Sequence, residues 1–319
     1  MGALTDLLAF LDAGRPCALA TVIECWGSAP EPVGARLAIA ADGTFTGAVS
    51  GGCVEGDVIA EALALMDGAR ARGVERRYGI SEDTAFSHGL ACGGTIRILI
   101  QRAGEGGLGR AAIAALAEAE GDGPARVLET RLADFEARVR PAAPGEATGL
   151  SADGTVFRQL CAPPVRLVLV GAVEIARRLA GLAGPLGLAV TLVDPRPAFA
   201  TAERFPGADI VPLWPDEALA ARPLTEQMAL VTLAHDPRLD DPALDAALAS
   251  PAFHIAALGS RKTHAARLAR LAARGHGPEA LARIKGPAGL PIGAVGAGEI
   301  ALSILAEIIA RRRGAALAG

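Results

Sequence analysis

Aromatic side chains are scarce in this chain of 319 residues, where Phe, Trp and Tyr make up 3% of positions. Hydrophobic residues nevertheless account for 51% of the sequence, so apolar surface for large cores is available. These cores must therefore be aliphatic and built from Ala, Leu, Val and Ile. The length favours two domains rather than one.

Cysteines are few, basic residues do not outnumber acidic ones, and long apolar runs are absent from the sequence. The formal net charge of -4 argues against a nucleic-acid partner, because such domains carry a basic face. Five cysteines are too few for a disulfide framework and favour free thiols in a reducing compartment. No apolar stretch reaches the roughly 20 residues of a membrane span. The apolar segment Leu4–Leu11 is too short for a leader peptide and carries Asp6. We therefore expect a cytoplasmic protein without a membrane partner.

Short strand-like runs dominate the first hundred residues. They cover residues 17–23, 36–40, 45–49 and 95–100. Asp42-Gly43 lies between the second and third runs and predicts a hairpin. Asp57 is expected to be the N-cap of a helix that continues to Met66. Residues 1–102 are thus expected to form a mixed α+β domain with an antiparallel component.

The pattern is less regular over residues 103–164. One helix is expected at residues 111–120, and residues 141–154 are rich in Pro, Gly and Ala. We interpret this stretch as an irregular connecting region that ends at the domain boundary beside Pro163 and Pro164.

Strand and helix patterns alternate over residues 165–319. The run at 165–170, apolar except for Arg166, is typical of a parallel strand covered on both faces. Further strands are expected at residues 189–193, 229–233 and 254–258, with helices at 175–183, 241–249, 262–273 and 298–310. This alternation predicts the α/β class, with a Rossmann-like doubly wound parallel sheet. The basic run Arg311–Arg313 would complement the negative end of the last helix.

Two cysteines lie in glycine-dense turns. The motifs consist of Gly51, Gly52 and Cys53, and of Cys92, Gly93 and Gly94. Glycine lets the backbone approach a ligand closely, so we interpret both motifs as ligand-binding loops. A packed loop cysteine is the alternative for each. Their spacing matches no structural zinc site, and nothing specifies the base of a cysteine hydrolase. We therefore expect neither a metal ligand set nor a catalytic residue.

The turn Gly171-Ala172-Val173-Glu174 follows a strand and opens a helix, where a dinucleotide fingerprint belongs. Asp194 ends the next strand about 20 residues later, near the position of a ribose-binding carboxylate. However, Val173 replaces the middle glycine, and Glu174 places a negative charge where phosphate would bind. This motif supports the fold and disfavours NAD(P) as a cofactor.

A better anion site begins at Gly259, after the strand at 254–258. Backbone N–H groups, a capping Ser260 and the cation Arg261 would converge at the carboxyl edge of the sheet. A well-capped helix with solvated cations is an equally good interpretation. His235 and Asp236 also leave a strand end and are open as pocket residues.

Two further features near these strand ends have plain structural interpretations. Asp241 and Pro242 are interpreted as the N-cap and first residue of a helix. The Gly- and Pro-rich loop at 286–298 would either close over a ligand or connect two elements.

These motifs resemble, in order and over nearly the whole chain, those of the XdhC/CoxI family. The matching stretches are residues 28–36, 50–57, 91–94, 193–196, 234–237, 257–264 and 289–309. The resemblance implies a cytoplasmic accessory protein, commonly a homodimer, that matures molybdenum hydroxylases such as xanthine dehydrogenase. Family members bind the molybdenum cofactor transiently, support its sulfuration by a cysteine desulfurase and deliver it to the apo-enzyme. The family commonly has Gly-Ala-Gly-His where this chain has Gly171–Glu174.

The resemblance also implies roles for individual residues. Cys53 and Cys92 would approach the sulfur-rich centre, glycine N–H groups would hold the pterin, and Ser260 and Arg261 would hold phosphate. The full expected set is Gly51, Gly52, Cys53, Cys92, Gly93, Gly94, Asp194, His235, Gly259, Ser260 and Arg261. Two other functions stay open: an NAD(P)-dependent oxidoreductase, and a sulfur-transfer enzyme with a persulfide on Cys92.

Overall fold

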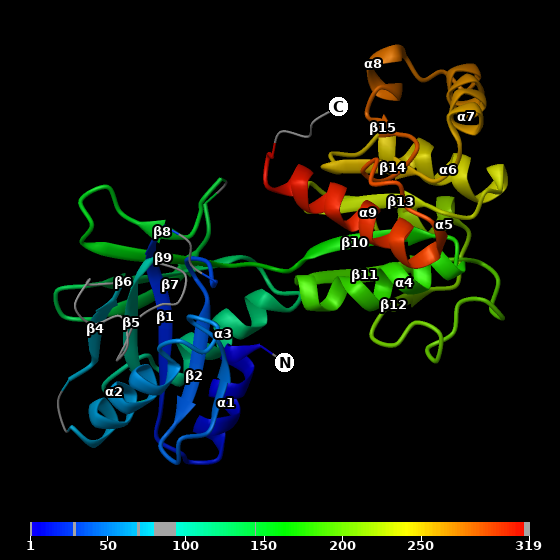
Figure 1. Ribbon diagram of the computed structural model, residues 1–319. Coiled ribbons are helices and arrows are strands. Elements are labelled where there is room, and N and C mark those ends of the chain that lie inside the picture. The colour runs from blue at the N-terminus through cyan, green and yellow to red at the C-terminus, as the bar shows by residue number, and fades with distance from the viewer. Residues whose placement is uncertain (1, 28–29, 69–70, 80–93, 144, 316–319) are drawn as a thin grey trace. The chain divides into compact units, whose positions relative to one another are not determined.

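The computed structural model describes residues 2–27, 30–68, 71–79, 94–143 and 145–315 (Figure 1). The chain divides into two compact units, Met1–Pro163 (unit 1) and Pro164–Gly319 (unit 2). No helix in the described ranges is long and apolar enough to cross a membrane.

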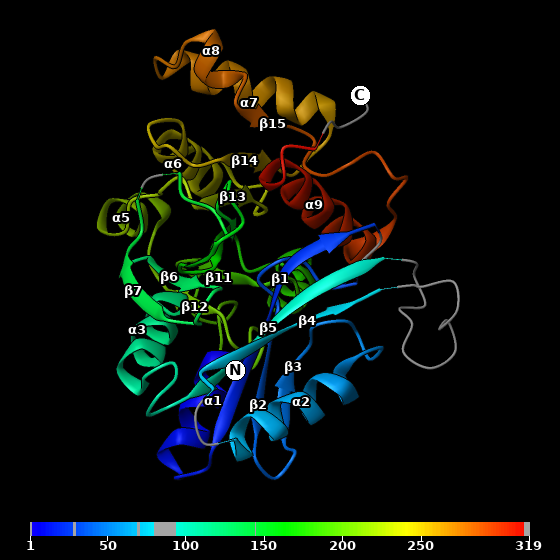
Figure 2. The ribbon, with the colours of Figure 1, turned by 90° about the vertical axis from the view of Figure 1, so that its left-hand side faces the viewer.

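A five-stranded antiparallel sheet forms the centre of unit 1 (Figure 2). Its order is β3 (Phe45–Gly47), β2 (Arg36–Ala40), β1 (Cys17–Trp26), β5 (Thr95–Ala103) and β4 (Gly73–Tyr78). Alternate residues of β1 enter two different cores, because strand side chains alternate between faces. Helix α2 (Glu55–Asp67) packs on one face, and α1 (Ala3–Asp12) and α3 (Arg110–Glu120) pack on the other. The predicted hairpin is confirmed, since the N–H of Gly43 donates to the Ala40 carbonyl at 2.9 Å.

The segment 103–164 is ordered into regular elements, so the expectation of an irregular connection was wrong. After α3 come β6 (Arg126–Arg131), β7 (Ala137–Pro141), β8 (Gly149–Leu150) and β9 (Val156–Cys161), in the sheet order β7-β6-β9-β8. Glu129 of β6 lies directly opposite Arg138 on one side and Arg158 on the other. Cross-strand ion pairs thus stabilise these polar strands, and apolar periodicity cannot detect them.

Unit 2 contains a six-stranded parallel sheet and confirms the predicted Rossmann-like α/β class. The strand order is β12 (Asp209–Val211), β11 (Leu188–Val193), β10 (Val165–Val170), β13 (Met228–Thr232), β14 (His254–Ala257) and β15 (Ile284–Lys285). One face packs against α4 (Glu174–Ala183) and α9 (Gly296–Arg312). The other packs against α5 (Pro215–Ala221), α6 (Pro237–Leu248) and α7 (Arg261–Ala273). The strand order places the switch point between β10 and β13, where such sheets bind ligands.

Two helix starts differ from the sequence-based expectation. Helix α6 begins five residues earlier than Pro242, with Asp236 as N-cap accepting the Arg238 N–H at 2.9 Å. Asp241 lies inside the helix, where its carboxylate pairs with Arg270 of α7 at 2.7 Å. The sequence Asp-Pro occurs at 236–237 and again at 241–242, so the sequence alone offers two possible helix starts. In the structure Asp236 is the N-cap, and Asp241 instead contacts α7. Similarly, Asp57 lies in the first turn of α2, whose N-cap residue is Val54.

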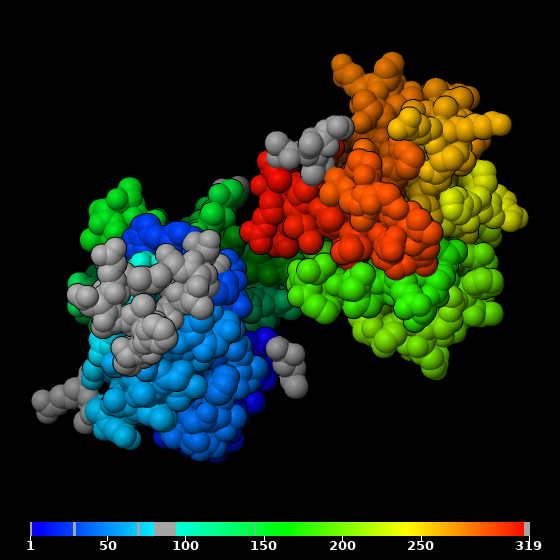
Figure 3. All heavy atoms as spheres, in the orientation of Figure 1, coloured from blue at the N-terminus to red at the C-terminus, as the bar shows by residue number. Residues whose placement is uncertain are grey.

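The loop between β15 and α9 connects these elements along the surface of α9 (Figure 3). The N–H of Gly289 donates to the Glu307 carboxylate at 2.9 Å, and the N–H of Leu290 donates to the Ser303 carbonyl at 3.2 Å. Because both bonds end on α9, the loop is held against its own helix.

Candidate functional site

The loop after β3 is organised around the buried carboxylate of Glu55. The N–H groups of Val49, Ser50 and Gly52 donate to it at 3.1, 2.8 and 2.8 Å, and the Ser50 hydroxyl donates as well. Burial alone would raise the pKa of Glu55, but the hydrogen bonds from Ser50 and Val49 lower the pKa to about 2. The carboxylate is therefore ionised at neutral pH and acts as an internal anion around which the loop folds. The sequence motif contained Glu55 but did not reveal this role.

Cys53 is exposed on this loop and forms no disulfide. Gly51 and Gly52 precede it with φ angles of 70° and 108°, which L side chains rarely adopt. A Cβ on Gly52 would meet no atom within 4 Å, so the backbone conformation, not crowding, requires glycine there. The Gly52 N–H is bonded to Glu55, whereas no hydrogen bond in the described ranges involves the N–H of Gly51 or Cys53. The loop can therefore offer a ligand one thiol and two N–H groups.

The other described cysteines are unsuited to this role. Cys17 and Cys161 are buried, and burial raises their pKa values to about 11 and 12. The Cys25 thiol lies 3.6 Å from the Glu31 carbonyl oxygen, and burial raises its pKa too. Among the described cysteines, Cys53 is thus the exposed thiol.

The sheet register brings the Cys53 loop and the start of β5 to the same end of the unit 1 sheet. Thr95 at the start of β5 pairs with Trp26 at the end of β1, and Gly94 directly before it is buried. Pro30, which follows β1, lies 3.4 Å from the position of a Cβ on Gly51. Cys92 and Gly93 lie outside the described residues, so their ligand contacts stay a prediction.

An exposed aromatic side chain that the sequence analysis missed lies at this end of the sheet. Trp26 is 42% exposed, and the Arg77 guanidinium lies over its ring at 5.1 Å. Both residues lie near strand ends. In the sequence they look like ordinary strand residues, so nothing indicated that they lie together on the surface.

Asp194 stabilises the loop after β10 through hydrogen bonds. These bonds engage its carboxylate and do not support the predicted contact with a cofactor. Its carboxylate accepts the Ala172 N–H at 2.7 Å and the Arg196 N–H at 2.9 Å. The Arg196 guanidinium also bonds both oxygens, at 2.8 and 2.6 Å. Burial opposes ionisation, but Arg196 and the Ala172 N–H lower the pKa. Fully buried and surrounded by these donors, the carboxylate is engaged within the protein.

The turn at Gly171 serves packing rather than phosphate binding. Its φ is 102°, and a Cβ there would lie 2.8 Å from the backbone nitrogen of Ala234. Glycine thus permits close approach of the end of β13. At the start of α4, Glu174 pairs with Arg177 at 2.7 Å and Arg178 at 2.9 Å. Its carboxylate already complements the positive helix end, which disfavours a phosphate there.

His235 and the Ser260 loop lie at the carboxyl ends of the neighbouring strands β13 and β14. His235 is exposed and has a φ of 57°, a left-handed conformation that is rare outside glycine and frequent at functional sites. Ser260 is confirmed as the N-cap of α7, accepting the Thr263 N–H at 3.1 Å. Gly259 has a φ of 138°, and Arg261 is exposed. These residues share the ligand-binding edge of a parallel sheet.

A buried ion pair supports the Ser260 loop and was missed by the sequence analysis. Arg267 of α7 and Asp240 of α6 are 1% and 2% exposed, and their nearest charged atoms are 3.7 Å apart. Arg267 also donates to the Leu258 carbonyl at 2.8 Å. Burial raises the pKa of Asp240 to about 6 despite the nearby guanidinium. The signal in the sequence was that Arg267 shares the buried face of α7 with Leu271.

No group of three or more His, Cys, Asp or Glu side chains in the described part of the chain is arranged to hold a metal ion.

Comparisons with known proteins agree over both units. Residues 10–79 match the XdhC and CoxI family, and residues 167–308 match the XdhC Rossmann domain. The chain is 31% identical over 303 residues to the molybdenum cofactor insertion chaperone PaoD of Escherichia coli K12, covering 95% of this chain and 85% of that protein. It is 28% identical to a probable subunit of xanthine dehydrogenase from Bacillus subtilis 168, covering 97% of each.

A solved structure shares this fold. It is described as a xanthine dehydrogenase from Bacillus halodurans and matches with a TM-score of 0.79 and 23% identity, over 98% of this chain and 96% of that one.

Proposed function

Because this chain belongs to the XdhC and CoxI family, we propose that it is an accessory chaperone that carries the molybdenum cofactor to a molybdenum hydroxylase such as xanthine dehydrogenase. The names of the Escherichia coli and Bacillus subtilis relatives support this role. The observation that carries the proposal is the exposed Cys53 thiol on a loop organised by Glu55.

The residues of this loop suit such a cargo chemically. The cofactor has a sulfur-rich molybdenum centre, for which a thiolate is a suitable soft partner. The N–H groups of Gly51 and Cys53 can donate to oxo or pterin oxygens, as successive N–H groups do in anion-binding loops. Gly52 would act through its backbone conformation, since its N–H is bonded to Glu55. Cys92, Gly93 and Gly94 would complete the site.

In unit 2 we propose an anion-binding area at the carboxyl edge of the sheet. It consists of His235, Gly259, Ser260 and Arg261. Arg267 stabilises this loop by donating a hydrogen bond to the Leu258 carbonyl. An exposed cation beside the free N–H groups of a helix start favours a phosphate group. Asp194 is left out of the proposed set because its carboxylate is engaged by Arg196 and Ala172.

The finer steps of the proposal depend on the family resemblance. We propose that the bound cofactor receives its terminal sulfur ligand from a cysteine desulfurase before delivery to the apo-enzyme. We also propose that the protein acts as a homodimer in the cytoplasm.

The test is cofactor retention. Purified protein is mixed with freshly released molybdenum cofactor and desalted, and molybdenum and pterin are assayed in the protein fraction. We expect near-stoichiometric retention by the wild type and its loss in Cys53→Ser and Cys92→Ser. Cys17→Ala, which removes a buried thiol at the other end of β1, is the matched control and should retain cofactor. Failure of the wild type to retain cofactor contradicts the function, and retention by both serine variants contradicts the thiol site.

Two further assays on the same purified protein test the two other functions. An NAD(P)-dependent oxidoreductase must bind a nicotinamide cofactor, and Asp194 and Glu174 are both engaged where that cofactor would bind. A fluorescence titration with NADH that saturates would favour it. A persulfide on Cys92 after incubation with a desulfurase would favour a sulfur-transfer enzyme.

A further inference from the structure

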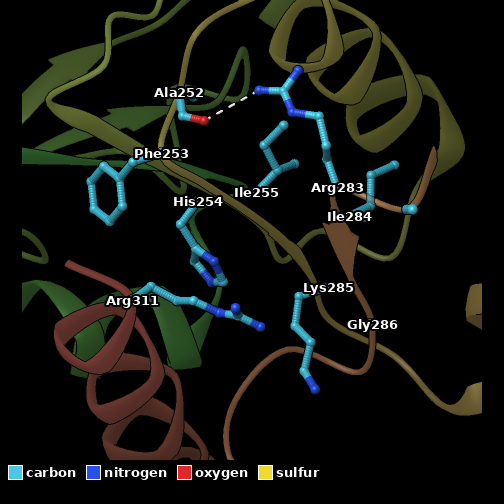
Figure 4. Close-up of a pocket in the computed structure, with 10 residues that line it drawn as sticks. Ala252, Phe253, His254, Ile255, Arg283, Ile284, Lys285, Gly286 and Arg311 are labelled. Atoms are coloured by element: carbon cyan, nitrogen blue, oxygen red, sulfur yellow. Dashed lines mark hydrogen bonds between the residues drawn. The ribbon is translucent and has the colours of Figure 1, made fainter. Parts of the chain in front are cut away.

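A cavity of about 330 Å³ lies in unit 2 between the edge strand β15, the start of β14 and the last turns of α9 (Figure 4). Its lining includes the basic side chains His254, Arg283, Lys285 and Arg311 and no acidic side chain. None of its lining residues belongs to the anion-binding area proposed above. The volume lies at the lower end of the range for small-molecule sites.

The strand register explains why three of these basic residues meet. Lys285 pairs with Ala256 in the parallel sheet, and His254 lies two residues before Ala256. Because side chains alternate, His254, Ala256 and Lys285 all lie on the face that α9 covers. On α9, Arg311 lies one turn after Glu307 and on the same side of the helix. Figure 4 shows the Arg311 side chain extending beneath the His254 ring, with the Lys285 side chain to one side of them.

Two buried polar atoms near this cavity have no hydrogen-bond partner in the described part of the chain, one on His254 and one on Glu307. His254 is 5% exposed, and its Nε2 has no hydrogen-bond partner among the described residues. This atom is 3.6 Å from Glu307 Oε2, which is longer than a hydrogen bond. Lys285 Nζ is 3.7 Å from Glu307 Oε1, and that oxygen is also buried without a hydrogen-bond partner in the described ranges. Since an unpartnered buried polar atom is unfavourable, His254 Nε2 is available to an acceptor atom of a ligand in the cavity.

The charges around the cavity favour an anion. The Arg283 guanidinium donates to the carbonyl oxygens of Leu248, Ser250 and Ala252 at 2.7, 2.8 and 3.2 Å, so it is engaged in the wall. Lys285 pairs with the buried carboxylate of Glu307, whereas no ion pair of Arg311 is found in the described part of the chain. The cavity therefore has an excess of positive charge.

We propose that this cavity binds a small phosphomonoester, independently of the cofactor-carrier function. Lys285 and Arg311 would donate charge-assisted hydrogen bonds to the phosphate oxygens, and His254 Nε2 would donate a further one. Three donors from three different elements suit a tetrahedral oxyanion better than a planar carboxylate. The cavity is larger than a bare phosphate, and Phe253 in its lining offers an apolar contact for the organic part.

The experiment titrates the full chain with glycerol 3-phosphate, inorganic phosphate and acetate. NMR follows the imidazole signals, with His254 assigned through His254→Gln, and calorimetry gives Kd. We expect a saturable His254 shift with glycerol 3-phosphate, weaker binding of inorganic phosphate and still weaker binding of acetate. Lys285→Ala and Arg311→Ala should each raise Kd about tenfold, as expected for a charge-assisted hydrogen bond.

The matched control is Arg313→Ala, which removes an exposed charge from the same helix end outside the cavity. Its Kd should stay within about twofold of wild type, because a surface charge contributes little. A His254 signal that does not shift overturns the proposal. Equal weakening by Arg313→Ala and Arg311→Ala also overturns it, since binding would then follow net charge. Acetate binding as tight as that of the phosphomonoester would overturn the assigned ligand class.

Discussion

Replacing Glu55 by Gln should loosen the Cys53 loop at neutral pH and have little effect near pH 2. In the folded protein the pKa of Glu55 is about 2, compared with 4.5 for an ordinary Glu. By linkage, this difference corresponds to about 3 kcal/mol of stability for unit 1. The unfolded state binds the proton more tightly than the folded state does. The contribution is therefore complete above about pH 5 and is lost as the pH falls through about 2.

The side-chain chemistry of Gln makes the loss specific to this loop. The Gln amide has one acceptor oxygen, and its NH₂ group would face the N–H donors of Ser50 and Gly52. We expect Glu55→Gln to lower the free energy of unfolding by about 2–3 kcal/mol at pH 7, because buried donors are left unpaired. The difference from wild type should shrink steadily between about pH 5 and pH 2.

The assay uses the two tryptophans of the chain, Trp26 in unit 1 and Trp214 in unit 2. In a Trp214→Phe background, urea unfolding followed by fluorescence reports on unit 1 alone. Glu105→Gln changes an exposed carboxylate and is the control, expected to stay within about 0.5 kcal/mol of wild type. The reasoning is refuted if Glu55→Gln is as stable as wild type at pH 7, or if its deficit is the same at pH 2 and pH 7.

Two further predictions concern unit 2. Asp240 has a pKa of about 6 rather than 3.8, so the folded state binds its proton more tightly and stability falls as the pH rises from about 4 to 6. Asp240→Asn should flatten that decline in urea unfolding followed by Trp214 fluorescence, and an unchanged pH profile would contradict this. Gly171→Ala should lower stability by about 2 kcal/mol or more in thermal unfolding, because its Cβ would lie 2.8 Å from the Ala234 nitrogen. Gly187→Ala, with a φ of 69° and no atom within 4 Å, should cost only about 1 kcal/mol, and equal losses would show that crowding is irrelevant.

The parallel sheet of unit 2 was predictable because its strands are buried on both faces. The run at Val165–Val170 is apolar except for Arg166, and the neighbouring strands are apolar except for a threonine each. The β7-β6-β9-β8 sheet was not predictable in this way. Its central Glu129 is stabilised by arginines of neighbouring strands, and its pKa is lowered to about 2, first by Arg140. Pairing between distant charges leaves no periodic signal.

In the candidate site too, some features could be predicted from the sequence and others could not. The glycines before Cys53 indicated a turn, and the structure adds that Gly51 and Gly52 have positive φ angles there. Spacing also placed Asp194 where a ribose ligand would be. However, spacing carries no information on Arg196, whose guanidinium takes both carboxylate oxygens.

The sequence by itself determined the Rossmann-like alternation, the family and the glycine turn before Cys53. Each follows from local periodicity, composition or a contiguous motif. Only the tertiary structure decided that Glu55 anchors the turn and that His254, Lys285 and Arg311 line one cavity. The reason is that hydrogen bonds and charges act between atoms near in space, and the residues of the cavity come from three elements that only the folded sheet brings together.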